Sequence, residues 1–246
     1  MSRGTIGEYS LMDHYRRTVA VAGILFGIGT VAGLVSVSLT DPVLSAPNVL
    51  ASVAAGESIV YVGALLELAM GLALVAMSVM LYPVLAGFDV RAALGYFGAR
   101  LVEFVIYIVG VISLLSLVTL SRDYVTAGAP AAAHYQTMVQ VALEARDWGG
   151  HVILDVAVFP LGALLFYYVL HGARLVPRWL STWGLAGAAL YWTAAPLVLF
   201  GALEPFSRAH IALQAPLGIQ EIVLALWMIF KGFSTQAATL SGVDVE

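Results

Sequence analysis

Four acidic residues lie inside long apolar stretches of the 246-residue chain: Glu67, Glu103, Asp155 and Glu221. Arg100 lies three residues before Glu103, so the two side chains share one face if the stretch is helical. An ionisable group in hydrocarbon costs at least about 2.5–3.5 kcal/mol on insertion scales, and such groups usually mark a polar site inside the protein. The pattern therefore predicts an internal acidic site that contains one arginine.

The excess of acid over base suggests what this site does. One arginine cannot neutralise four carboxylates in a dry environment, so we expect at least one of the acids to be protonated at neutral pH. A neutral carboxylic acid in an apolar cavity is a competent proton donor. Glu67, Glu103, Asp155 and Glu221 are therefore candidates for acid/base catalysis or proton transfer, with Arg100 as a binding residue. The alternative is that Arg100 and Glu103 form an ion pair that only fixes helix packing.

A second group of candidates recurs at four-residue spacing: Asp147, His151 and Asp155. On an α-helix these side chains stack along one face, and we expect them to lead protons or a polar ligand inward. The alternative is that Asp147 caps a helix N-terminus and His151 reaches interfacial water. We predict no metal, although His151, Asp155 and a neighbouring glutamate leave a metal site open.

Three aromatic residues are predicted to line the same site. Tyr107 falls one helical turn after Glu103, and Tyr191 and Trp192 lie near the middle of a later apolar stretch. Aromatic rows at helical spacing also serve packing, and that alternative stays open here. No cofactor is expected, because the chain has no glycine-rich phosphate loop and no HExxH or GxSxG motif.

The composition identifies the elements that must position these residues. The chain is 61% hydrophobic and 11% charged, and its mean hydropathy is +0.94. This leaves too little polar surface for a soluble globule, and the sequence predicts an all-α, polytopic membrane protein. We expect one transmembrane domain over residues 1–246 with six spans at about 18–39, 58–85, 91–120, 148–170, 178–203 and 213–230.

The connections between the spans carry their own signals. Asn48 is positioned to cap a short interfacial helix that ends near Ala55. The second half of residues 121–146 is predicted to be an amphipathic helix on the membrane surface, between the third and fourth spans. Residues 1–13 form a polar N-terminal segment, and the polar tail 234–246 is expected to be disordered.

The basic residues predict the orientation in a plasma membrane. Most of them fall on one side if both termini are cytoplasmic, which is the side expected to be richer in Arg and Lys. That side receives Arg3, Arg16, Arg17, Arg91, Arg174, Arg178 and Lys231, and the other side receives Arg122, Arg146 and Arg208. At about 1.5 Å per residue, Glu67, Asp155 and Glu221 then lie about 10–14 Å below the outer boundary, and Glu103 about halfway across.

The same composition limits the partners. The net charge is −4 and the basic residues are scattered, so no nucleic-acid partner is expected. The absence of cysteine excludes disulfides and thiolate chemistry. Membrane lipids and a lipophilic small molecule are the expected partners, and a homo-oligomer is allowed but not indicated.

Two functional hypotheses follow. In the first, the acids bind a lipophilic ligand such as a lipid or isoprenoid and process it by acid/base chemistry. In the second, they form the relay of a proton-coupled carrier or channel. A structural scaffold is the remaining alternative. The first is favoured, because below Arg100 the inner half offers mainly Ser78, Tyr82 and Tyr168 and no continuous polar path.

Three short stretches also resemble a known family. They are Arg100-Leu-Val-Glu103, Leu175-Val-Pro-Arg-Trp-Leu180, and Glu221 followed by Ala225-Leu-Trp-Met-Ile-Phe-Lys-Gly232. The chain from Tyr15 to Gly232 resembles a prokaryotic membrane family catalogued as a domain of unknown function, number four-three-eight-six. This resemblance implies a six-helix prokaryotic membrane protein and brings no established activity with it.

Overall fold

The computed structural model describes residues 3–127, 132–204 and 207–234, and every regular element in these ranges is a helix. The helices are α1 (Arg3–Leu44), α2 (Val49–Ala55), α3 (Glu57–Ala86), α4 (Val90–Ala127), α5 (Ala132–Asp147), the π-helix η2 (Trp148–Val158), α6 (Phe159–Gly172), α7 (Arg178–Leu199) and α8 (Arg208–Phe230). The predicted all-α class is confirmed for these residues.

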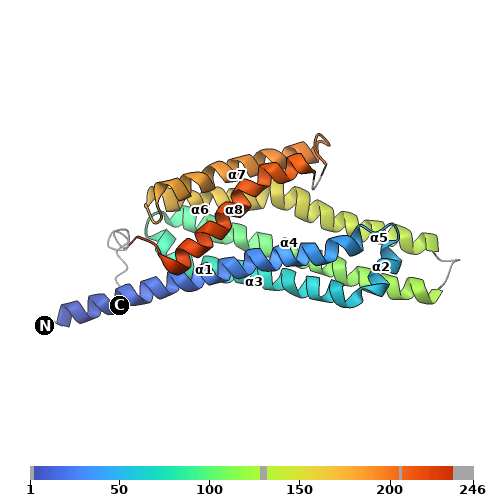
Figure 1. The fold of residues 1–246 in the computed structure, drawn as a ribbon, viewed down its shortest axis with the longest axis horizontal. Coiled ribbons are helices and arrows are strands. Elements are labelled where there is room, and N and C mark those ends of the chain that lie inside the picture. The colour runs from blue at the N-terminus through green and yellow to red at the C-terminus, as the bar shows by residue number, and fades with distance from the viewer. Residues whose placement is uncertain (1–2, 128–131, 205–206, 235–246) are drawn as a thin grey trace.

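The long helices run up and down one elongated bundle (Figure 1). The start of α1 and the end of α8 lie at the same end, which we call the terminal end. The short helix α2 and the α4–α5 hairpin lie at the opposite end, which we call the far end. Helices α5, η2 and α6 follow one another as a single rod from the far end to the terminal end.

Five of the described helical rods are long and apolar enough to cross a membrane. They are Asp13–Leu44, Glu57–Ala86, Val90–Ala127, Ala133–Gly172 and Arg208–Phe230. Large apolar side chains also point outward: on α1, Ile24, Ile28 and Val31 are 47%, 48% and 57% exposed. An apolar outer surface is what hydrocarbon requires and what water disfavours. The chain is therefore a multi-pass membrane protein. The remaining expected span, α7, is not among the five.

The α4–α5 hairpin differs from the expected surface helix. Helix α4 continues past Leu120 to Ala127, and α5 then returns alongside it (Figure 1). The rings of Tyr124 and Tyr135 meet edge to face at 6.4 Å, and Val139 is buried in the same apolar cluster as Val118. These cross-hairpin contacts pack α5 against α4. The predicted helix in the membrane plane was wrong, because α5 runs along the bundle.

The short helix at the far end was predicted correctly. Helix α2 spans Val49–Ala55, and the side chain of Asn48 accepts a hydrogen bond from the Ala51 N–H at 3.1 Å. This is the N-cap that the sequence indicated. Of the predicted disordered tail, residues 235–246 lie outside the described part of the chain. The polar N-terminal segment is helical from Arg3 onward.

A close crossing of α1 and α8 organises the terminal end. A Cβ added at Gly23 would lie 2.7 Å from the Met228 Cβ and 3.0 Å from the Ala225 carbonyl, so the two backbones meet there. From this crossing the two helices diverge toward the far end (Figure 1). The core beside the crossing is apolar and includes a stacked ring pair, Tyr96 and Phe166, at 4.7 Å. The bundle is therefore closed at the terminal end.

The π-helix η2 follows from an interrupted hydrogen-bond ladder. Pro160 has no N–H and cannot return the usual bond to the Val156 carbonyl four residues earlier. That carbonyl instead accepts a 2.7 Å hydrogen bond from the indole N–H of Trp192 on α7. Wider turns of this kind often occur at functional sites.

Candidate functional site

Two adjoining cavities occupy the space between the diverging helices. The first, which we call the Glu221 cavity, has a volume of about 460 Å³, and its polar lining includes Arg100, Glu103 and Glu221. The second, the Asp155 cavity, has a volume of about 280 Å³ and is lined by Glu67, Arg146 and Asp155 among others. Both cavities share the side chains of Met70, Tyr107 and Tyr191 as a common wall. All four predicted acids therefore line one or the other cavity.

Arg100 and Glu103 form a buried pair in the wall of the Glu221 cavity. Their exposed fractions are only 4% and 2%, and the Arg100 Nη1 donates to the Glu103 Oε2 at 2.7 Å. Tyr107 donates its hydroxyl to the other Glu103 oxygen at 2.6 Å. The guanidinium also lies over the rings of Tyr96 and Phe159, at 5.4 Å and 5.7 Å from their centroids. Glu103 is thus fully hydrogen-bonded, and Arg100 is held in place by rings on two helices.

Glu67 has a partner that the sequence did not reveal. Arg146, at the end of α5, donates to both Glu67 oxygens at 2.5 Å and 3.0 Å, across 79 residues of sequence. A Cβ added at Gly110 on α4 would lie 2.9 Å from the Arg146 Nη1, so the glycine provides the room for the guanidinium. The expected charge balance of four acids against one arginine was therefore wrong, because Arg146 enters the bundle and neutralises Glu67.

Asp155 accepts hydrogen bonds from two helices. The hydroxyl of Tyr191 on α7 donates to its Oδ1 at 2.7 Å, and the side-chain amide of Gln214 on α8 donates to its Oδ2 at 3.3 Å. Asp155 is 4% exposed. It carries a full set of neutral donors but no cation within salt-bridge distance among the described residues.

Glu221 differs from the other three acids. It is half-buried on α8, lines the Glu221 cavity, and makes no hydrogen bond or ion pair with any residue that the structure describes. Arg100 and Glu103 interact with it electrostatically from across the cavity. The amide of the preceding Gln220 is already used, since it accepts from the Tyr167 hydroxyl and donates to the Leu180 carbonyl. Glu221 is the acid that is available to a ligand.

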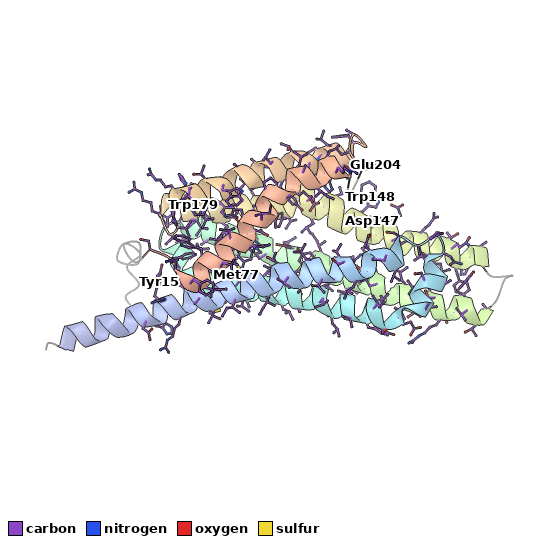
Figure 2. All side chains as sticks on the ribbon, in the orientation of Figure 1. Tyr15, Met77, Asp147, Trp148, Trp179 and Glu204 are labelled. Carbon is purple, nitrogen blue, oxygen red and sulfur yellow. The ribbon has the colours of Figure 1, made fainter. Side chains whose placement is uncertain are left out.

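The two described side chains of the predicted ladder, Asp147 and Asp155, line different cavities. Asp147 ends α5, and Asp155 lies in the π-helical segment Trp148–Val158 that follows it. Asp147 lines a different cavity, together with Trp148 and Glu204 near the end of α7 (Figure 2), and not the Asp155 cavity. It also lies inside a continuous helix, so the capping alternative was wrong as well. The His151 side chain lies outside the described part of the structure.

The three aromatic candidates separate into two roles. Tyr107 and Tyr191 form the wall shared by the two cavities and donate to Glu103 and Asp155. Trp192 is 43% exposed, bonds the Val156 carbonyl and lines neither cavity. The structure thus brings the two tyrosines into the site and leaves the tryptophan outside it.

Two further residues of the site were missed in the sequence. Gln214 approaches Asp155 from α8, and Arg146 approaches Glu67 from α5. No local spacing connects either residue to its partner. The one available signal was that an ionised Glu67 in an apolar stretch needs a cation, and Arg146 lies two residues before the predicted fourth span.

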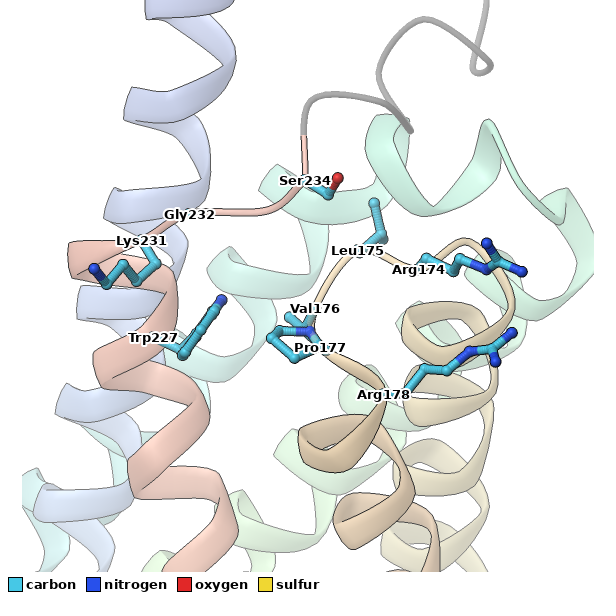
Figure 3. Close-up of a pocket in the computed structure, with 9 residues that line it drawn as sticks. All are labelled: Arg174, Leu175, Val176, Pro177, Arg178, Trp227, Lys231, Gly232 and Ser234. Carbon is cyan, nitrogen blue, oxygen red and sulfur yellow. The ribbon is translucent and has the colours of Figure 1, made fainter.

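Another cavity, of about 600 Å³, lies at the terminal end near the start of α7. Its lining includes Arg174, Arg178 and Lys231. Figure 3 shows the Lys231 ammonium on one side of this cavity and the two guanidinium groups on the other, all directed away from its centre. None of the four predicted acids reaches it. This cavity is therefore separate from the acidic site.

Comparisons with known proteins give one match. Neither the search of curated proteins nor the search of solved structures found a match. The family model described as "Domain of unknown function (DUF4386)" matches residues 21–232. This range begins within α1, ends just after α8 and includes every residue that lines the two acidic cavities. The chain therefore belongs to the DUF4386 family of proteins, as the resemblance of its short motifs indicated.

Proposed function

We propose that this multi-pass membrane protein binds a lipophilic molecule in the Glu221 and Asp155 cavities and exchanges protons with it. The observation that carries the proposal is the convergence of four acids from four helices on two cavities with a common wall. Together the cavities fall in the range of about 300–1,000 Å³ that is usual for small-molecule sites. Their walls combine apolar side chains with a few polar groups, as such sites usually do.

The ligand enters from the bilayer between α1 and α8. Leu34 on α1 and Ile219 and Ile222 on α8 line the Glu221 cavity and are also 58%, 55% and 43% exposed at the outer surface. A side chain that faces both a cavity and the outside lies at an opening. Gly218 is beside them, and a Cβ added there would meet no atom within 4 Å. The divergence of α1 and α8 from their crossing at Gly23 supports this path (Figure 1).

The chemistry available at the wall is proton exchange. Tyr107 and Tyr191 each line both cavities and each donate to a buried carboxylate, Glu103 and Asp155 respectively. A phenol and a carboxyl group in contact can pass a proton to or from a bound molecule. Acid/base processing of the ligand is therefore the reaction class that these groups support.

A proton-coupled carrier is the second candidate, and its support is weaker. The same acids would serve as its relay, but a carrier also needs a polar path to the terminal end. The core there is mainly apolar, and two of its buried polar side chains are bonded within the protein: the Ser78 hydroxyl donates to the Val75 carbonyl, and the Gln220 amide is used by Tyr167 and Leu180. These features favour a pocket over a conduit.

We propose that the chain crosses the plasma membrane six times, with both termini in the cytoplasm. Helix α7 has 22 residues, and at about 1.5 Å per residue it is long enough for a bilayer core of about 30 Å. The start of α1 and the end of α8 lie at one end of the bundle (Figure 1). Trp179, Trp183 and Trp227 cluster near that end, as interfacial anchors do.

The orientation is tested by single cysteines, because the chain has none of its own. In intact cells, a membrane-impermeant thiol reagent should label Ser45→Cys at the far end and leave Ser234→Cys unlabelled until the membrane is opened. Labelling of Ser234→Cys in intact cells would contradict cytoplasmic termini.

The binding proposal is tested by blocking the opening. The full chain in lipid nanodiscs is irradiated with a photoreactive dodecanol, and labelled peptides are located by mass spectrometry. We expect labelling at Leu34, Ile219 or Ile222, and its loss in Gly218→Trp. The matched control is Gly27→Trp, since a Cβ at Gly27 also meets nothing within 4 Å but the residue lines neither cavity. Equal labelling of the two variants would contradict a ligand in these cavities.

A further inference from the structure

We propose that the molecule bound in the Glu221 cavity is a lipophilic amine, whose ammonium group pairs with the Glu221 carboxylate. This inference rests on the proposed function, because it names the chemical class of the ligand for the same cavities. It follows from the charges that line the cavities, from the hydrogen bonds of each acid, and from the apolar and aromatic side chains around Glu221.

The charge count leaves one acid unpaired in each cavity. In the Glu221 cavity the charged residues are Arg100, Glu103 and Glu221, and Arg100 is paired with Glu103 at 2.7 Å. In the Asp155 cavity Arg146 is paired with Glu67, and Asp155 and His210 are the other titratable side chains among the described lining residues, apart from tyrosines. Both arginines are already committed to an acid. A ligand that enters these cavities therefore meets a carboxyl group that no described arginine pairs with, which disfavours an anion and favours a cation or a base that accepts a proton from the acid.

The hydrogen bonds decide between the two unpaired acids. Asp155 accepts from Tyr191 and Gln214, so both of its oxygens have donors. Glu221 has none among the described residues, although it lines a cavity within an apolar stretch. A carboxyl group in such a place needs a donor, and an ammonium group supplies both the hydrogen bond and the opposite charge. Glu221 is therefore the position where the head of the ligand binds.

The surroundings of Glu221 suit the rest of such a molecule. Phe159 and Tyr191, whose ring centroids are 4.8 Å apart, line the same cavity and add aromatic surface to it. Toward the opening, Leu34, Ile219 and Ile222 provide an apolar path for an alkyl chain to the bilayer. A neutral alcohol fits the same path but leaves the carboxylate charge uncompensated.

The experiment compares two photoreactive probes of equal chain length, dodecylamine and dodecanol, on the full chain in nanodiscs. We expect the amine to label the residues at the opening more strongly than the alcohol. Glu221→Gln keeps the size of the side chain and removes its charge. It should lower labelling by the amine at least about tenfold, which is the loss of affinity expected when a hydrogen bond to a charged group is removed. Labelling by the alcohol should not change, which also reports that the variant is folded. The matched control is Glu144→Gln, an exposed acid on α5 that lines neither cavity.

The outcomes separate this inference from the proposed function. If Gly218→Trp abolishes labelling by both probes but Glu221→Gln affects neither, the cavities bind lipophiles and the amine assignment is overturned. If Glu221→Gln lowers labelling by both probes equally, Glu221 acts through shape and not through charge, which also overturns it. If neither probe labels the opening in the unaltered chain, the proposed function itself fails.

Discussion

The ion pair between Glu67 and Arg146 is the contact that joins the α5 rod to the centre of the bundle. It connects α3 to α5 across 79 residues, with two hydrogen bonds at 2.5 Å and 3.0 Å. We predict that Arg146→Met and Glu67→Gln each lower the free energy of unfolding strongly. We also predict that the double variant loses less of this free energy than the two single losses added together. The physical reason is that each single change leaves the other charge buried without a partner.

The magnitude follows from how far the pair is buried. The side chains of Arg146 and Glu67 are 17% and 10% exposed, so little water reaches either group. Removing one partner of a fully buried pair costs about 3–5 kcal/mol, and the remaining exposure reduces this to about 2–4 kcal/mol for Arg146→Met. Because the double variant leaves no orphan charge, we expect a coupling of about 2 kcal/mol in the double-mutant cycle. Reversible unfolding in mixed micelles or by steric trapping measures all four free energies.

The chain contains a matched control for this cycle. Arg122 on α4 and Glu57 on α3 also form two hydrogen bonds, at 2.7 Å and 2.8 Å, and are also far apart in sequence, but their position is exposed. Surface pairs of this kind contribute little, because water screens them and two long side chains must be ordered. We expect the Arg122→Met and Glu57→Gln changes to add without measurable coupling. Additive losses for Glu67 and Arg146, or equal coupling for the two pairs, would refute the reasoning from burial.

Two further predictions concern the supports of the site. Gly110→Val should displace the Arg146 guanidinium, because a Cβ at Gly110 would lie 2.9 Å from its Nη1, and should cost about as much stability as Arg146→Met. The control is Gly98→Val, where a Cβ meets nothing within 4 Å. Equal stability of the two valine variants would contradict the close fit at Gly110. Tyr191→Phe removes a 2.7 Å hydrogen bond to the buried Asp155 carboxyl and should cost about 1–3 kcal/mol by the same unfolding assay, whereas an unchanged stability would show that water replaces the phenol.

The class of the protein could be predicted because it depends on composition and local pattern alone. Apolar stretches of about twenty residues specify membrane helices wherever they occur, and Asn48 specifies a cap through a contact three residues away. The same holds for Arg100, Glu103 and Tyr107, which share one face of a single helix and do form hydrogen bonds there. These features need no knowledge of how distant helices pack.

The errors share one physical cause, which is contact between distant segments. The π-helix ends just before Pro160, which frees a carbonyl that Trp192 on another helix then takes, and Asp147 and Asp155 line different cavities. Helix α5 runs along the bundle and not in the membrane plane, because Tyr135 and Val139 pack against residues of α4. No spacing within either segment encodes the position of its partner.

Composition and local spacing are enough to identify a helical membrane protein with four acids and an arginine within its apolar stretches. Only the tertiary structure decided which acids are neutralised, because an ion pair such as that of Glu67 and Arg146 depends on the register of two helices and on the space beside Gly110. Glu103 is hydrogen-bonded on both oxygens, whereas Glu221 lines a cavity with no donor of its own among the described residues.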